Sequence, residues 1–161
     1  MKNRYFWLSL IVLIALLLRL YKINAPIADW HSWRQADTSA VTRNYVRHGI
    51  NLLYPTYDDL SNVASGKDNP KGLRFVEFPL YNAYSVVIDK LFPGYNVEFS
   101  GRLASILASI GSMIFLFLIT RKYLDRKTAF LTAFFFAVLP YNIYFSRTTL
   151  PEPFMVFLSL G

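Results

Sequence analysis

The sequence contains no cysteine, so it can form neither a disulfide bond nor a thiolate metal site, and the redox compartment is undetermined. Acidic residues are few: 10 stand against 17 lysines and arginines, which gives a formal net charge of +7. The chain also lacks an internal repeat, a phosphate-binding glycine loop, a nucleophile elbow and zinc-ligand spacing. These absences remove the motifs by which nucleotide-binding proteins, serine hydrolases and zinc enzymes are usually identified.

Apolar residues are in excess: they fill 54% of the 161 positions and are concentrated in long uncharged blocks. Blocks of this kind predict membrane-spanning helices rather than one large soluble core. Basic residues flank the blocks, so we attribute the positive charge to membrane topology and to anionic lipid head groups, and expect no nucleic-acid partner. The expected fold class is therefore an all-α polytopic membrane protein.

The apolar blocks predict three complete transmembrane helices and the truncated start of a fourth. The uncharged core of the first block is short, and we expect Arg19 at its end to snorkel to the interface. A cleaved signal peptide is the alternative for this block, but Pro26 makes the following stretch a poor cleavage site. The last block stops at Gly161, so we expect an incomplete N-terminal part that is inactive alone. The predicted spans are residues 5–21, 102–120, 128–146 and, truncated, 150–161.

The short connection at residues 121–127 contains four basic residues. By the positive-inside rule it lies in the cytoplasm, as does the N-terminus with Lys2 and Arg4. Both assignments place the long loop of residues 22–101 outside. We therefore expect a multi-pass protein of the inner or plasma membrane of the cell.

The outer loop contains two amphipathic segments, which predict juxtamembrane helices at residues 38–48 and 79–92. Asp37 is expected to cap the first helix and Gly49 to end it. Pro79 opens the second helix, whose apolar face suits the membrane interface, although packing against an outer domain is the alternative. The polar face of this second helix carries Asn82, Ser85, Asp89 and Lys90.

Three acidic residues, Asp37, Glu77 and Glu152, fall on the outer side of this topology near the lipid boundary. A carboxylate there is costly unless it is paired, hydrated or used in chemistry. Each also has a structural alternative. Asp37 can cap a helix, and Glu77 can favour a helix N-terminus through the helix dipole. Glu152 can pair with Arg147. The shared side of all three favours a functional site.

Four short motifs add a further signal: HSWRQADT at residues 31–38, EFPL at 77–80, LFPG at 91–94 and LPEPF at 150–154. In this order and spacing they resemble the N-terminal part of membrane glycosyltransferases with the GT-C fold. The chain is similar to the family 39-like group, which includes protein O-mannosyltransferases and the bacterial transferases that add aminoarabinose to lipid A.

The resemblance implies transfer of a hexosyl or pentosyl group from a polyprenyl-phosphate-linked donor to a lipid, glycan or protein hydroxyl on the outer face, usually with inversion. An aspartate of the first outer loop is the base in this family, which makes Asp37 the candidate and Asp29 the runner-up. The commoner family pattern has Asp-Glu about nine residues before an arginine. Counting back from Arg43 reaches Arg34 and Gln35, so Asp37 lies one helical turn further on.

The departing phosphate needs positive charge close to it. In some relatives, acidic residues corresponding to Glu77 and Glu152 bind a metal, so the resemblance allows a divalent cation such as Mg²⁺, Mn²⁺ or Zn²⁺ at these two positions. The alternative for His31 is a hydrogen-bonding loop residue. The residues expected at the donor phosphate or substrate are His31, Arg34, Gln35, Arg43, Arg74 and Arg147.

Two other classes of protein have the same general features. A small non-catalytic multi-pass membrane protein needs no group of acidic residues on one face. A protein that binds or flips a lipid carrier uses basic and amphipathic segments, together with membrane lipids, but needs no base. The acidic residues on the outer side therefore favour the transferase.

Overall fold

The computed structural model describes the backbone of residues 3–27, 30–62 and 66–161, and side chains from residue 6 onward. Within these residues the regular elements are helices, joined by loops that hold one isolated bridge between Thr56 and Leu73. The predicted all-α class is therefore confirmed. The chain divides into two compact units: residues 1–23 together with 105–161 form the first, and residues 24–104 form the second.

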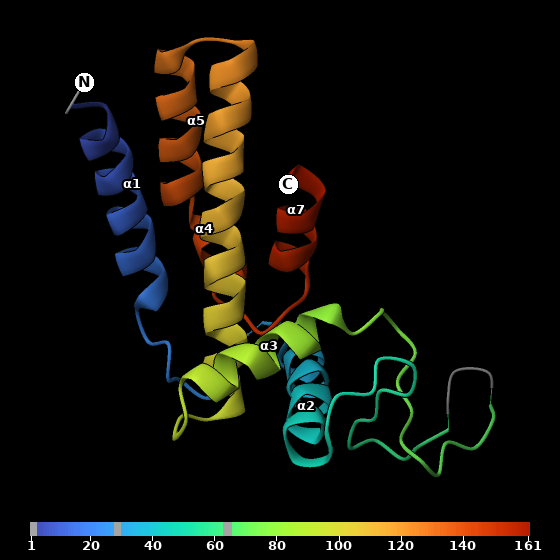
Figure 1. The fold of residues 1–161 in the computed structure, drawn as a ribbon. Helices are drawn as coiled ribbons and strands as arrows, with labels where there is room; N and C mark the ends of the chain where they lie inside the picture. Colours follow the sequence, from blue (N-terminus) through green and yellow to red (C-terminus); the bar gives the residue numbers. More distant parts are fainter. Residues whose placement is uncertain (1–2, 28–29, 63–65) are drawn as a thin grey trace. The chain divides into compact units, whose positions relative to one another are not determined.

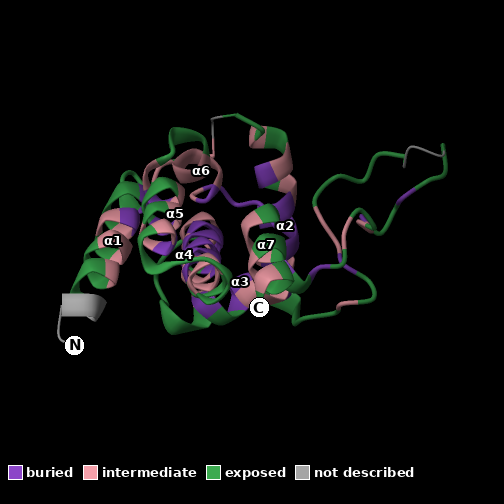
Figure 2. Ribbon diagram, turned by 90° about the horizontal axis from the view of Figure 1, so that it is seen from above, coloured by how far each residue is buried: buried purple, intermediate pink, exposed green. Residues whose placement is uncertain are grey.

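The first unit contains apolar helices that lie side by side in the order α1, α5, α4 and α7 (Figures 1 and 2). Among the described residues, α4 alone is long and apolar enough to cross a membrane, since 27 residues at about 1.5 Å each reach about 40 Å. The three complete spans therefore stay a prediction. The bounds are Asn3–Leu20 for α1, Val97–Tyr123 for α4, Arg126–Val138 for α5, Pro140–Phe145 for α6 and Glu152–Leu160 for α7; the start of α4, residues 97–104, belongs to the second unit.

Small residues allow close packing in this unit. Ala129, Ala133 and Ala137 recur every fourth position of α5 and are fully buried, which lets neighbouring backbones approach closely. On α4, the absence of a side chain at Gly111 serves the same purpose, because a Cβ there would lie 2.4 Å from the Phe157 ring of α7.

The third predicted span is wrong as a single helix, because the structure breaks it at Leu139. The backbone of Leu139 is extended, so α5 ends at Val138 and α6 begins at Pro140. Proline has no N–H to donate to the carbonyl four residues earlier, which here belongs to Phe136. The break therefore leaves backbone carbonyls at the end of α5 that need other donors.

Arg19 of α1 supplies those donors. Its Nη2 donates to the carbonyl of Phe136 at 3.1 Å and its Nη1 to that of Ala137 at 2.9 Å. Its Nε donates to Ser146 Oγ at 2.7 Å. The side chain is fully buried, so the expected snorkelling of Arg19 is not what the structure shows. Arg19 instead caps a broken helix, which satisfies polar groups that lipid could not.

The second unit is built on α2 (Ser32–His48) and α3 (Leu80–Leu91), which pack against each other. The predicted N-cap at Asp37 is wrong, because α2 begins earlier and its N-cap is His31 in the left-handed conformation. Asp37 lies in the second turn of the helix. The predicted end is confirmed: Gly49 follows with a φ of 91° and donates its N–H to the Tyr45 carbonyl at 3.0 Å.

The polar face of α3 is the one that packs against α2. Asn82 Nδ2 donates to the Thr38 carbonyl at 2.8 Å and to Thr42 Oγ1 at 3.0 Å. Asn82 and Ser85 are both buried, which the expectation of a solvated polar face did not anticipate. The opposite side of the helix leaves its apolar side chains exposed, as expected for an interfacial helix. The exposed apolar residues are Leu80, Val87, Leu91 and, after the helix end, Phe92.

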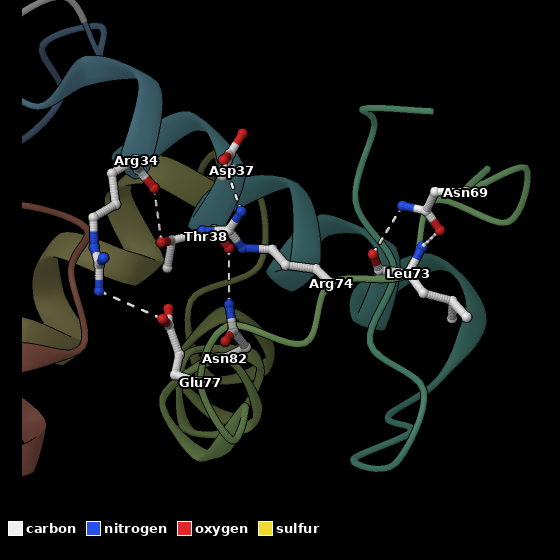
Figure 3. Close-up of polar contacts among 8 residues, drawn as sticks. All are labelled: Arg34, Asp37, Thr38, Asn69, Leu73, Arg74, Glu77 and Asn82. Atoms are coloured by element: carbon white, nitrogen blue, oxygen red, sulfur yellow. Dashed lines mark hydrogen bonds and ion pairs between the residues drawn. The ribbon is translucent and has the colours of Figure 1, made fainter. Parts of the chain in front are cut away.

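The loop between α2 and α3 is fixed by a turn at residues 69–73. Asn69 bonds the backbone of Leu73 twice, at 2.9 and 3.0 Å (Figure 3). Gly72 adopts a φ of 57°, and a Cβ there would lie 2.6 Å from the carbonyl oxygen of Tyr57. The Arg74 N–H then donates to the Pro55 carbonyl at 2.9 Å. These contacts position Arg74 beside α2.

Candidate functional site

Asp37 on α2 forms an ion pair with Arg74. Arg74 Nη1 donates to Asp37 Oδ2 at 2.8 Å, and the side chains are 9% exposed for Arg74 and 27% for Asp37 (Figure 3). Within the described part of the chain, Oδ1 of Asp37 has no hydrogen-bond partner. The pair therefore orients the carboxylate through one oxygen and leaves the other able to accept a proton.

A second ion pair lies one helical turn earlier. Arg34 Nη2 donates to Glu77 Oε2 at 3.4 Å, with each side chain 28% exposed. Glu77 comes from the segment that follows Arg74 and leads into α3, so two consecutive turns of α2 each receive one charge from the loop (Figure 3). The four charges cancel, and the cluster is neutral overall.

Thr38 connects this cluster to α3. Its hydroxyl donates to the Arg34 carbonyl at 2.8 Å, and its own carbonyl accepts from Asn82 at 2.8 Å (Figure 3). The bonds that Thr38 and Asn82 make between α2 and α3 were not predicted from the sequence. The only signal in the sequence was Asn82 itself, an amide on the polar face of the second predicted helix. A buried amide needs hydrogen-bond partners, so such a residue can indicate packing against a neighbouring helix.

The hollow between these residues is small. Lined by Thr38, Arg74, Glu77 and Asn82, it measures about 10 Å³, which is room for about one water molecule. A sugar does not fit inside it. A substrate hydroxyl therefore reaches Asp37 only from the exposed side of the carboxylate.

The remaining predicted residues of the opening motif shape the start of α2. Gln35 is fully buried, and its amide donates to the Trp30 carbonyl at 3.0 Å. His31 lies edge-on to the Trp30 ring, with centroids 5.9 Å apart. Gln35 and His31 thus hold the helix start in shape. Asp29, the runner-up base, lies outside the described residues.

Arg43 lies on the other side of α2. It pairs with Asp58, while the Asp37 side of the helix faces Arg74. Six residues at 100° each separate Asp37 from Arg43 by about 120° around the helix axis. The structure therefore does not bring Arg43 together with the two ion pairs of the cluster.

Two of the predicted residues belong to the first unit. Arg147 lies over the Tyr21 ring, 5.7 Å from its centroid. Glu152 opens α7 and borders a mostly apolar hollow of about 170 Å³. The buried hydroxyl of Ser109 lines the same hollow, and within the described chain it has no hydrogen-bond partner.

The described residues do not form a metal site. No three His, Asp or Glu side chains in this part of the chain gather closely enough to hold an ion. Glu77 is already bonded to Arg34. A divalent cation at Glu77 or Glu152 therefore stays a prediction, and the positive charge that the structure shows beside Glu77 is Arg34.

The two units together define a helical membrane protein with carboxylate–arginine pairs on a loop between its apolar segments. The family model for the dolichyl-phosphate-mannose-protein mannosyltransferases matches residues 79–160. The chain belongs to this family of membrane glycosyltransferases, which use a polyprenyl-phosphate-linked sugar. No curated protein and no solved structure matches the chain. The predicted family is confirmed.

Proposed function

We propose that the protein transfers a hexosyl or pentosyl group from a polyprenyl-phosphate donor to a hydroxyl of a lipid, glycan or protein, with inversion at the sugar. One observation supports this proposal most directly: Asp37 is oriented by Arg74 through one carboxylate oxygen while the other is unoccupied. A general base needs a fixed position and one available lone pair at the acceptor hydroxyl.

In the proposed reaction, one bond forms at the anomeric carbon and one breaks, and Asp37 takes up the released proton. The acceptor oxygen attacks the anomeric carbon, its proton passes to Asp37 Oδ1, and the bond from that carbon to the phosphate oxygen breaks. The phosphate leaves with the electron pair of that bond, and attack from the opposite face inverts the configuration. Arg34 and Arg74 are the cations nearest this base that can stabilise the developing negative charge.

The experiment for this proposal is a donor screen with the full-length protein in detergent. Polyprenyl-phosphate-linked hexoses and pentoses, each carrying a radiolabelled sugar, are offered with lipid, glycan and peptide acceptors. We expect one donor class to give labelled product with the inverted anomeric configuration. Addition of EDTA tests the predicted cation in the same assay. A protein that inserts correctly and transfers no sugar from any donor would contradict the proposal.

The proposal also includes the topology. We propose that the protein is multi-pass, with residues 22–101 on the outer face and residues 121–127 in the cytoplasm, because the basic hairpin obeys the positive-inside rule. Reporters fused at residue 60 should then read outside, and reporters at residue 124 should read inside. The reverse result would place residues 22–101 in the cytoplasm and would remove the outer-face site, although the spans at 5–21, 102–120 and 128–146 would remain with inverted orientation.

A further inference from the structure

The second unit has a polar pocket on the side of α2 that faces away from Asp37. Its volume is about 410 Å³, within the roughly 300–1,000 Å³ range of small-molecule sites. Ala36, Ser39 and Arg43 of α2 line it, and at 100° per residue they cluster about 160° from the face that bears the two ion pairs. The pocket is therefore separate from the cluster around Asp37.

The floor of this pocket holds an unsatisfied hydroxyl. Ser39 is 2% exposed, and its Oγ has no hydrogen-bond partner among the described residues. Most buried serines in the helices around it bond a carbonyl one turn earlier, as Ser85 does with Tyr81 at 2.9 Å. Burying a hydroxyl without a partner is unfavourable, so a ligand that bonds Ser39 would recover that free energy.

The walls supply further donors and acceptors. Asn96 accepts the Phe99 N–H at 2.8 Å through Oδ1, which leaves its amide nitrogen as a donor. Glu98 adds a carboxylate at the first turn of α4, and Asn24 adds an amide at the opposite edge. The buried guanidinium of Arg102 holds the carbonyls of residues 25 and 26 beside Asn24, so this wall is fixed before a ligand arrives.

The charges of the pocket select the class of ligand. The charge of Arg43 is neutralised by Asp58, so the carboxylate of Glu98 gives the pocket a net charge of about −1. This negative charge repels phosphate and other anions. Two carboxylates without a third acidic or histidine ligand also fall short of a metal cluster within the described chain. Amides, carboxylates and a free hydroxyl around an apolar patch at Ile27 match the alternating hydroxyls and C–H faces of an uncharged sugar ring.

We propose that this pocket binds a neutral saccharide unit through Ser39, Asn96 and Glu98, as a site distinct from the transfer centre. The site needs neither Asp37 nor the donor phosphate. It gives the protein a means to hold an uncharged glycan independently of the chemistry at Asp37.

The test is saturation-transfer difference NMR on the full chain in detergent, with methyl α-D-glucopyranoside, methyl α-D-mannopyranoside and maltose as probes. We expect saturation on the ring protons of at least one probe. Ser39→Ala should weaken its binding about fivefold, the value of one hydrogen bond, without lowering the melting temperature. Ala36→Leu, which fills the pocket, should abolish binding. Ser85→Ala removes a buried serine hydroxyl outside the pocket and should bind as the wild type.

Three results would overturn the proposal: no saturation on any probe, equal binding by wild type, Ser39→Ala and Ala36→Leu, or competition by inorganic phosphate. Asp37→Asn should bind the probe normally. Loss of transfer in that variant with intact binding separates the two sites. A protein that binds no probe but still transfers sugar would contradict the saccharide site and would leave the proposed transfer function intact.

Discussion

Replacement of Asp37 by asparagine is expected to reduce sugar transfer by about 10²- to 10⁴-fold, the usual contribution of a general base. Asparagine keeps the size of the side chain and can still accept the hydrogen bond from Arg74, but it cannot take a proton from the acceptor hydroxyl. Because the carboxylate is partly exposed, loss of its charge should cost only about 1 kcal/mol of stability. The measurement is initial transfer rate together with the melting temperature.

Asp89→Asn is the matched control. Asp89 is also a half-buried carboxylate in the second unit, and it accepts a hydrogen bond from Ser100 Oγ at 3.0 Å. The same chemical change there should leave transfer within about twofold of the wild type, since surface and structural substitutions of this kind have small effects. Wild-type transfer by Asp37→Asn would remove Asp37 from the mechanism.

Replacement of Arg19 by methionine should destabilise the first unit by about 1–3 kcal/mol, the cost of one unsatisfied buried group. The change removes a donor from the carbonyls of Phe136 and Ala137, and Phe136 keeps the Asn142 amide as a donor while Ala137 loses the one that Arg19 provides. Removal of the buried charge recovers part of this cost. Unfolding in a detergent series would give the loss, and Lys122→Met, at an exposed cation on α4, should be close to neutral.

The link between Arg19 and the helix break can be tested by a double-mutant cycle. Pro140→Ala restores an N–H that can donate to the Phe136 carbonyl and continue the helix. Arg19→Met should therefore cost less in the Pro140→Ala background than in the wild type, by about 1 kcal/mol or more. Equal costs in both backgrounds would show that Arg19 does not act through the broken end of α5.

Local chemistry made several elements predictable. Gly49 could be recognised as a helix end because glycine adopts the positive φ found at this position at little cost. The helix at residues 79–92 follows from apolar spacing, and the structure places α3 within one residue of it at each end. The break before Pro140 was also predictable, because proline has no N–H to continue the helix. The uncharged run of residues 128–146 nevertheless favoured a single span.

Long-range pairing was not predictable from the sequence. Asp37 and Arg74 are 37 positions apart and meet because the turn at Asn69 and Gly72 fixes the strand-like segment before Arg74. No periodic pattern in the sequence predicts that these two residues lie close together. The helical position of Asp37 was misjudged for a related reason: α2 starts at Ser32, where Gln35 holds the Trp30 carbonyl, and local cap preference favoured the later aspartate.

The packing of α3 has a practical consequence for handling the protein. Asn82 of its polar face is bonded to α2, while the apolar side chains of Leu80, Val87 and Leu91 are exposed. Lipid or detergent can cover such a surface, whereas water cannot. Residues 24–104 cut out and expressed alone would present it directly to solvent and would self-associate into aggregates. The solubility of residues 24–104 therefore depends on whether lipid or detergent covers this surface.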